Sequence, residues 1–419
     1  MNPHWEYVPF EKLFIWKEKS KIKSGDGKSI GKYKMFVCSD TEIKRYDEYI
    51  EKGESLVFGT GGKASCHFVD EPFAYSTDCV AAQRKSENIL TKFYYYYFRQ
   101  NHLGELQRTF TGSGLQHTSK KKISKIMVPV LSFDEQNLIV TLIEELLSQL
   151  DSGVEMLRKI KQQLAIYRLA VLKTAFEGKY TKEWRINHAD EDVKRDYYKI
   201  KIRNPVFKDT AGDENEIALS IPETWLKIRI GEIFDVEIGA TPRRSVSEYW
   251  GGNIKWVSSG EVHFSPINET NEHITQLGVD NSSTKVQPAG TVLLAMIGEG
   301  KTRGQAAILN VPAAHNQNTA AILVSKTPCS PKYLYYFLML NYENTRRVGS
   351  GNNQKALNKD RVKALRFPFT TFAEQEEIVK EIESRLSVSD SIEQTVEKAL
   401  QQADVLRQSI LKQAFEGKL

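Results

Sequence analysis

The stretch PVLSFDEQNLIVTLIEELLSQLDSGVEMLRKIKQQLAIYRLAVLKTAFEGK, residues 129–179, recurs as PFTTFAEQEEIVKEIESRLSVSDSIEQTVEKALQQADVLRQSILKQAFEGK, residues 368–418. The offset is 239 residues (368 − 129), no gap is needed, and 23 of the 51 aligned residues are identical. Self-similarity over such a period indicates two copies of one structural unit. The length of 419 residues agrees, because a single domain usually has about 150 residues.

Each copy has the three- and four-residue apolar spacing of a long amphipathic helix. Acidic residues occupy the first turn, and Gly178 and Gly417 stand where a left-handed residue would end the helix. The first predicted helix, residues 135–177, would be roughly 65 Å long at ~1.5 Å per residue. The residues predicted to pair the two helices along an apolar seam are Ile139, Ile143, Leu146, Leu150 and Leu157 in the first and Ile378, Ile382, Leu386, Val396 and Leu406 in the second.

A stretch of short β-rich runs broken by glycine lies ahead of each predicted helix, which indicates two α/β globules. Two equal units most often pair isologously, so we expect the helices to be antiparallel, with a globule at each end of a shared rod. The predicted fold class is α+β: two globules separated by two long antiparallel helices that form a coiled coil, with internal pseudo-twofold symmetry. The predicted segments are a first globule at 1–128, a first helix at 129–179, a charged, helix-poor connector at 180–220, a second globule at 221–367 and a second helix at 368–419.

The composition is that of an ordinary globular protein, with a formal net charge of +5 and a pI near 8.7. The four cysteines show neither a disulfide framework nor the spacing of zinc ligands, and no stretch approaches the ~20 apolar residues of a membrane span. We therefore expect a reduced, cytoplasmic protein. Basic residues gather just ahead of both copies of the repeated segment, within 112–127 and 346–366.

Charge runs are usually plain solvated surface, but their duplicated position makes phosphate contacts an equal alternative. In that case the divergent loops nearby would read base edges. The candidate DNA-binding residues are Lys34, Thr60, Lys63, Gln116, Lys120, Lys121, Lys122, Arg243, Arg244, Ser258, Ser259, Glu261, Lys301, Arg303, Gln354, Lys355, Lys359 and Arg361.

Several motifs hint at other chemistry without supporting it. Residues 295–302 loosely fit a phosphate-binding loop, but a β-like run follows them, so we predict a hairpin that presents Lys301 and Arg303 to a DNA backbone. Residues 204–207 resemble part of an amino-methyltransferase motif but lack its second proline, and we interpret them as a turn.

The aromatic run 94–98 could stack bases, but it matches 333–337 at the same offset of 239, and this favours globule core. The eight histidines are scattered, and no catalytic constellation emerges from their spacing to carboxylates or nucleophiles. The chain is predicted to be non-enzymatic.

A globule, then Pro-x-x-x-Phe-x-Glu-Gln, then a long helix ending in Ala-Phe-Glu-Gly-Lys, all present twice, resembles the DNA-specificity subunit of type I restriction-modification systems. Four further stretches are similar to the opening of that family's target recognition domains, although the first globule lacks the Pro-x-x-Trp opening and the Tyr-Trp-Gly-Gly run. These stretches are Ile221-Pro222-Glu223-Thr224-Trp225, Gly239-Ala240-Thr241-Pro242, the run from Tyr249 to Trp256, and Ser259-Gly260-Glu261.

The resemblance implies that each globule reads one half of a bipartite duplex DNA site and that the helices set the spacer between the halves. It also implies that this chain binds no cofactor and no metal. Its partners would be two methyltransferase subunits that carry S-adenosylmethionine, and restriction subunits that use ATP and Mg²⁺. The alternative is a non-catalytic coiled-coil interaction protein with basic ligand-binding globules.

Overall fold

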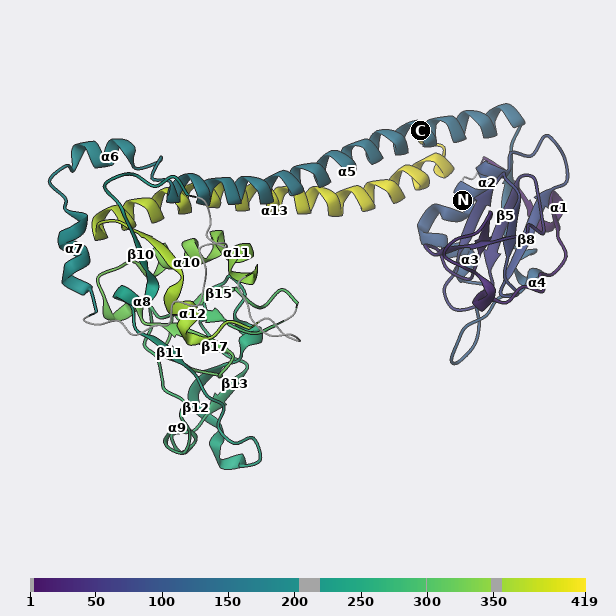
Figure 1. Ribbon diagram of the computed structural model, residues 1–419. Coiled ribbons are helices and arrows are strands. Elements are labelled where there is room, and N and C mark those ends of the chain that lie inside the picture. Colours follow the sequence, from purple (N-terminus) through teal and green to yellow (C-terminus); the bar gives the residue numbers. More distant parts are fainter. Residues whose placement is uncertain (1–3, 203–218, 299, 348–355) are drawn as a thin grey trace. The chain divides into compact units, whose positions relative to one another are not determined.

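The computed structural model describes residues 4–202, 219–298, 300–347 and 356–419. The chain forms two compact units, one made of Met1–Lys161 with Gln394–Leu419 and the other of Gln162–Glu393. Each unit contains one α/β globule together with part of helix α5 (Phe133–Phe176) and part of helix α13 (Phe372–Glu416) (Figure 1). No helix in the described ranges is both long enough and apolar enough to cross a membrane.

The first globule is entered and left through a pair of antiparallel strands, β1 (Glu6–Pro9) and β9 (Met127–Val130). Between them lie a four-stranded sheet of order β2-β8-β5-β6 and a three-stranded sheet of order β4-β3-β7. The four-stranded sheet contains β2 (Phe14–Trp16), β8 (Cys79–Arg84), β5 (Ser55–Gly59) and β6 (Cys66–Val69), the other contains β4 (Ile43–Tyr46), β3 (Tyr33–Phe36) and β7 (Phe73–Tyr75), and the main helices are α2 (Thr91–Arg99) and α4 (Lys120–Ile123).

The second globule repeats this topology strand for strand, with β10 (Leu226–Arg229) paired to β18 (Arg366–Phe369). Its sheets have the orders β11-β17-β14-β15 and β13-β12-β16, and β12 and β16 are parallel, as β3 and β7 are in the first globule. The strands of these sheets are β11 (Val236–Ile238), β17 (Thr319–Ile322), β14 (Val292–Ala295), β15 (Ala306–Ile308), β13 (Glu272–Ile274), β12 (Trp250–Val257) and β16 (Ala314–His315). The α-helices of this globule are α8 (Ile230–Ile233), α9 (Gln276–Asp280), α10 (Pro331–Leu340), α11 (Tyr342–Arg347) and α12 (Lys359–Ala364). The duplication therefore extends to the globules, whose sequences have diverged.

The aromatic runs of α2 and α10 are core, as predicted. The rings of Phe93 and Tyr97 lie 5.2 and 5.4 Å from that of Phe415 in the first unit. In the second unit Tyr333 and Phe337 lie 5.0 and 5.6 Å from Phe176. These contacts match at an offset of 240 rather than 239, so the predicted alignment of the two runs was wrong by one residue.

One contact keeps the offset of 239 in this region. The hydroxyl groups of Tyr94 and Tyr333 donate to the carbonyl oxygens of Pro129 and Pro368, at 2.9 and 3.0 Å. When the two helices are aligned at an offset of 240, Tyr333 matches Phe93, so the two hydroxyls come from adjacent positions rather than from equivalent ones. A run of consecutive tyrosines gives sequence matches in more than one register, and this explains the misalignment.

Both long helices end as predicted, with glycine in the left-handed conformation. Gly178 has φ +64° and Gly417 has φ +70°. The amide of Gly178 donates to the carbonyl of Ala175 at 2.9 Å, and the amide of Lys179 donates to the carbonyl of Thr174 at 3.2 Å. The same pair of bonds closes the helix at Gly417. This is the Schellman arrangement, in which glycine avoids the steric cost of a Cβ at positive φ.

The helices run antiparallel within each unit. In the first unit Asp151 pairs with Arg407 and Lys161 with Glu397, so a step of ten residues forward on α5 (161 − 151) matches ten backward on α13 (407 − 397). In the second unit Arg168 of α5 lies 2.6 Å from Asp390 of α13. The predicted antiparallel pairing is confirmed in both parts.

Most of the predicted seam is at least partly buried. Ile143, Ile378 and Ile382 are fully buried, but they belong to the globule cores, to which the helix ends contribute. Leu406 was predicted wrongly, because half of its side chain is exposed. The buried stripe of α13 passes through Val396, Ala403 and Ile410 at seven-residue steps, and Leu406 lies beside it. Val396 is buried as predicted, and Ile139, Leu146, Leu150, Leu157 and Leu386 are partly buried.

The connector is not poor in helix, contrary to the prediction. It contains α6 (Lys182–Asn187) and α7 (Val193–Ile200), and Val193 and Tyr197, four residues apart, are buried in the core of the second unit. Both helices are short and highly charged, so tertiary contacts rather than propensity stabilise them. The proposed turn at 204–207 lies outside the described residues.

The first globule does have an opening tryptophan. Trp5 immediately precedes β1, just as Trp225 immediately precedes β10, and its ring meets that of Phe415 edge-on at 6.4 Å. The Pro-x-x-Trp pattern missed it because the spacing to the preceding proline differs.

Candidate nucleic-acid interface

Two loops of the first globule bring several candidate residues together. The amide of Thr118 donates to the carbonyl of Thr60 at 2.9 Å, and the amide of Gly62 donates to that of Gln116 at 2.8 Å. The segment after β5 therefore lies along the segment ahead of α4. Nearby, the Nζ of Lys122 bonds to the hydroxyl of Thr111. Lys63, Gln116 and Lys121 are exposed in this region.

The second globule builds the same loop contact. The amide of Leu357 donates to the carbonyl of Met296 at 3.0 Å, which corresponds to the bond between Thr118 and Thr60. The connection after β14 is a hairpin, as predicted, since β14 pairs antiparallel with β15 and Gly304 turns the chain with φ +86°. A strand follows the glycine-rich loop, so its amides do not open a helix around a phosphate.

The basic residues of this second loop region differ in exposure and in hydrogen bonding. Lys301 is exposed, and Arg303 is half-buried with its Nη2 2.8 Å from the carbonyl oxygen of Arg346. Lys359 is exposed at the start of α12, and the amide of Arg361 bonds to the side chain of Asn358 at 2.9 Å. Gln354 and Lys355, two further candidates, lie outside the described residues.

Two of the lysine candidates already have partners within the protein. The Nζ of Lys120 donates to the carbonyl of Lys17 and lies 5.9 Å from the ring of Trp16. Partial burial lowers the pKa of Lys120, because desolvation disfavours its charge. Lys34, on β3, forms an ion pair with Glu71 at 2.7 Å. A phosphate contact by either lysine has to compete with these bonds.

Arg244 and Glu261 are also engaged. Arg244 makes a two-pronged contact to Glu272, and its guanidinium lies 3.9 Å from the ring of Trp250. The hydrogen bonds that Arg244 donates to Glu272 raise the pKa of Arg244. Glu261 accepts hydrogen bonds from the amide and hydroxyl of Ser258, both at 2.8 Å, and from the amide of Asn271 at 2.9 Å. Arg243 is exposed and Ser259 half-buried.

The glycines of the motifs in the second globule shape the scaffold rather than a contact surface. A Cβ at Gly239 would lie 2.0 Å from the carbonyl oxygen of His315, and one at Gly252 would lie 2.4 Å from that of Ile274. The indole of Trp256 donates to the carbonyl of Ala240 at 3.1 Å. These motifs therefore fix the backbone of the surrounding loops.

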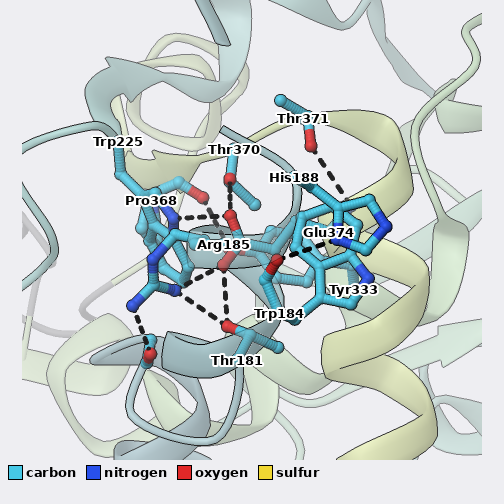
Figure 2. A network of polar contacts seen from close by, with 11 residues as sticks. Thr181, Trp184, Arg185, His188, Trp225, Tyr333, Pro368, Thr370, Thr371 and Glu374 are labelled. Carbon is cyan, nitrogen blue, oxygen red and sulfur yellow. Dashed lines mark hydrogen bonds and ion pairs between the residues drawn. The ribbon is translucent and has the colours of Figure 1, made fainter. Parts of the chain in front are cut away.

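A buried carboxylate at the start of α13 organises the second unit (Figure 2). Only 2% of the Glu374 side chain is exposed. Its Oε1 accepts hydrogen bonds from the hydroxyl of Thr181, at 2.7 Å, and from the guanidinium of Arg185. Its Oε2 accepts hydrogen bonds from the indole of Trp225, at 2.9 Å, and from the hydroxyl of Thr370. We call these five residues the Glu374 clasp.

The Glu374 clasp joins four elements. Arg185 also donates to the carbonyl of Gly178 at 2.6 Å, so the clasp ties the end of α5 to α6, to the residue ahead of β10 and to the start of α13. A buried charge with a complete set of partners has a structural role, not that of an acid or base. Of the five clasp residues, only Trp225 and Glu374 itself occupy defined positions of the motifs quoted above. The sequence showed only a glutamate in the first turn of a predicted helix, and this says nothing of its burial.

The equivalent position in the first unit has no such environment. Glu135 (374 − 239) is exposed, and its carboxylate accepts hydrogen bonds from the amide and hydroxyl of Ser132 at 2.9 and 2.6 Å. These two bonds hold the pKa of Glu135 below its usual value. The same residue type is thus a local helix cap in one unit and a core group in the other.

Comparisons with known proteins identify relatives of this chain. The chain is 24% identical to the specificity subunit of the type I restriction enzyme EcoDI of Escherichia coli, over 99% of this chain and 88% of that protein. It is 26% identical to the EcoBI specificity subunit of Escherichia coli, over 87% of this chain and 74% of that protein.

Solved structures share the fold at 14% identity. A chain from a study of complex assembly and conformational transition in the type I R-M system has a TM-score of 0.65, over 100% of this chain and 99% of that one. The HsdS subunit of Thermoanaerobacter tengcongensis has a TM-score of 0.55, over 100% of this chain and 98% of that one. The family model described as the type I restriction modification DNA specificity domain matches residues 2–165 and 222–402, and the chain therefore belongs to that family.

Proposed function

We propose that this chain is the sequence-specific DNA-binding subunit of a type I restriction-modification system, and that it recognises a bipartite duplex site through one half-site per globule. The observation that carries the proposal is the double match to the specificity domain on two globules of identical strand order. A shared scaffold with different exposed loops is what two unlike half-sites require. The coiled-coil interaction protein has no comparable support.

Exposed cations would supply the sequence-independent part of binding. Lys63 and Lys121 in the first globule, and Lys301 and Lys359 in the second, extend from the paired loop regions into solvent. Lysines placed this way neutralise phosphates and release counterions, which fixes the register of the protein on the duplex. Base edges would then be read by the polar residues of the same loops.

Chemistry would belong to partner subunits in the cytoplasm. Two methyltransferase subunits would carry S-adenosylmethionine and methylate adenine, and restriction subunits would use ATP and Mg²⁺. We expect the purified chain alone to show neither ATP hydrolysis nor methyl transfer.

The decisive experiment is methylome sequencing of the source cells with and without the gene. We expect a single two-part adenine methylation motif to disappear on deletion and return on complementation. Exchange of residues 226–369 for those of a relative should then change one half of the motif and leave the other half intact. An unchanged methylome after deletion refutes the proposal, and so does an exchange that alters both halves.

A further inference from the structure

The second globule has an open groove of about 810 Å³ that the DNA-binding proposal does not use. It lies between α10, the first turns of α13 and the edge strand β15, all within one unit. Its size falls within the ~300–1,000 Å³ typical of ligand pockets. The side chains that matter for its chemistry are Ile308, Lys332, Tyr335, Tyr336 and Glu383.

The first globule contains the same set of side chains, with one exchange. The strand ladders pair Leu56 with Phe68 and Val292 with Ile308, so Phe68 stands where the second globule has Ile308. The helix contacts repeat as well. Lys92 lies 2.9 Å from Glu144, and Lys332 lies 2.7 Å from Glu383. The hydroxyls of Tyr96 and Tyr336 bond to the same two carboxylates, at 3.3 and 3.4 Å.

An aromatic ring occupies this place in the first globule. The ring of Phe68 lies 6.3 Å from that of Tyr95, and the Nζ of Lys92 lies 5.5 Å from its centroid. A tyrosine and a lysine thus hold the ring from two sides, through an aromatic contact and a cation–π contact. Phe68 comes from the sheet edge, so the ring reaches the helices from an extended backbone.

The second globule keeps these partners without the ring. Tyr335 corresponds to Tyr95 and Lys332 to Lys92, but the shorter Ile308 leaves the space between them open. Phe264 meets Tyr335 edge-on at 6.5 Å between centroids, yet it is not among the residues that line the groove. The groove therefore keeps the tyrosine and the lysine that contact a phenyl ring in the first globule, but it lacks that ring.

We propose that this groove receives an aromatic side chain from a partner polypeptide, with the ring between Tyr335 and Lys332 in the place that Phe68 fills in the first globule. The groove is long enough for the residues that flank the aromatic one, because it continues past Ser330 to Val379 of α13. The ion pair of Lys332 and Glu383 forms part of its rim, next to the polar backbone of such a segment. The proposal does not depend on DNA recognition.

The test uses the full-length chain and the peptide acetyl-His-Phe-Val-amide, which copies His67 to Val69. Saturation-transfer NMR and a titration should show one saturable site, and replacing the phenylalanine of the peptide by leucine should weaken binding several-fold. Ile308→Phe places a phenyl ring in the groove, as Phe68 does in the first globule, and this variant should not bind the peptide there. Phe68→Ile is the matched variant, and it should add a second site by opening the equivalent groove of the first globule.

Three outcomes overturn the proposal. They are no saturable binding to the unmodified chain, binding that survives in Ile308→Phe, and benzamide that binds as tightly as the peptide, which would indicate a small aromatic ligand instead. A thermal melt of each variant confirms that it is folded. No DNA is present in these measurements, so their failure leaves the proposed function untouched.

Discussion

Glu374 and Glu135 occupy the same position of the repeat, yet their surroundings give them opposite roles. Glu374 is buried among four hydrogen-bond donors from three segments of the chain, while Glu135 faces solvent and caps its own helix. Removing one partner of a buried ion pair is costly because the other charge stays desolvated. Exposed carboxylates carry no such cost.

We expect Glu374→Ala to destabilise the second unit by about 3 kcal/mol, since Arg185 would remain largely buried without its carboxylate. The matched change Glu135→Ala should cost clearly less, because this carboxylate is exposed and only a local helix cap is lost. Urea unfolding followed by tryptophan fluorescence measures both losses, and hydrogen exchange over residues 178–200 locates the first. Equal losses at the two positions would contradict the structural role of the Glu374 clasp.

The buried side chain of His315 should make the stability of the second unit depend on pH. It is fully buried in β16, its Nδ1 lies 2.7 Å from the hydroxyl of Thr319, and burial lowers its pKa to about 4. The unfolded chain takes up a proton near pH 6.5 and the folded chain only near pH 4, so stability is present above pH 6.5 and is lost as the pH falls between these values.

The loss should reach about 3 kcal/mol for a shift of about 2.5 pKa units. We therefore expect the second unit to unfold at clearly lower urea at pH 5 than at pH 7.5. His315→Gln should reduce that difference, whatever it does to stability at neutral pH. An equal pH dependence in the variant would assign the effect to other groups.

At the scale of elements, the short helix α4 shows how one basic run serves two purposes. Lys120 turns inward to the carbonyl of Lys17 and the ring of Trp16, whereas Lys121 is exposed. Its counterpart α12 begins with the exposed Lys359. Three consecutive lysines cannot share one face of a helix, so the sequence run could not reveal this division.

We predict that Lys121→Gln weakens binding to duplex DNA of any sequence and lowers the slope of log K against log salt by about 0.9, the value for one phosphate contact. Lys120→Gln is the control, and it should leave the slope nearly unchanged because its ammonium group is already engaged. Fluorescence anisotropy across a salt series measures both slopes. A larger change in slope for Lys120→Gln would reverse the assignment of the two lysines.

The long helices and their ends were predictable because their signals are local: periodic apolar residues, an acidic first turn and a terminal glycine. Other features depend on contacts between distant segments. Helices α6 and α7 are too short and charged to be recognised alone, and they form against Trp225, Glu374 and the core around Tyr197. For the same reason the sequence did not reveal that Arg244 pairs with Glu272 or that Glu261 accepts hydrogen bonds from Ser258.

At the scale of the whole molecule, the resemblance predicts that helix length sets the spacer between half-sites. The ion pairs show which residues face each other, so a paired deletion can keep the rest in register. Removing residues 150–156 together with 402–408, the seven that face them, leaves Lys161 opposite Glu397 and Arg168 opposite Asp390. Seven residues correspond to about 10 Å of helix and to about two turns, so the remaining residues keep nearly the same faces.

We expect this double deletion to change the preferred spacer by roughly 3 base pairs, at ~3.4 Å per base pair, and to leave both half-site sequences as they were. Methylome sequencing of cells that express the variant gives both quantities at once. Deleting only residues 150–156 is the control, since it puts the helices out of register and should abolish methylation. New half-site bases with an unchanged spacer would refute the link between helix length and spacing.

The paired strands at the base of each globule have a consequence for how such genes change. The chain enters the second globule through β10 and leaves it through β18, which are hydrogen-bonded neighbours, and β1 and β9 do the same in the first. Each globule is thus a closed loop of chain with adjoining ends. Two crossovers, one in each strand of a pair, would replace one globule as an intact cassette, and we expect such an exchange between relatives to leave the other globule unchanged.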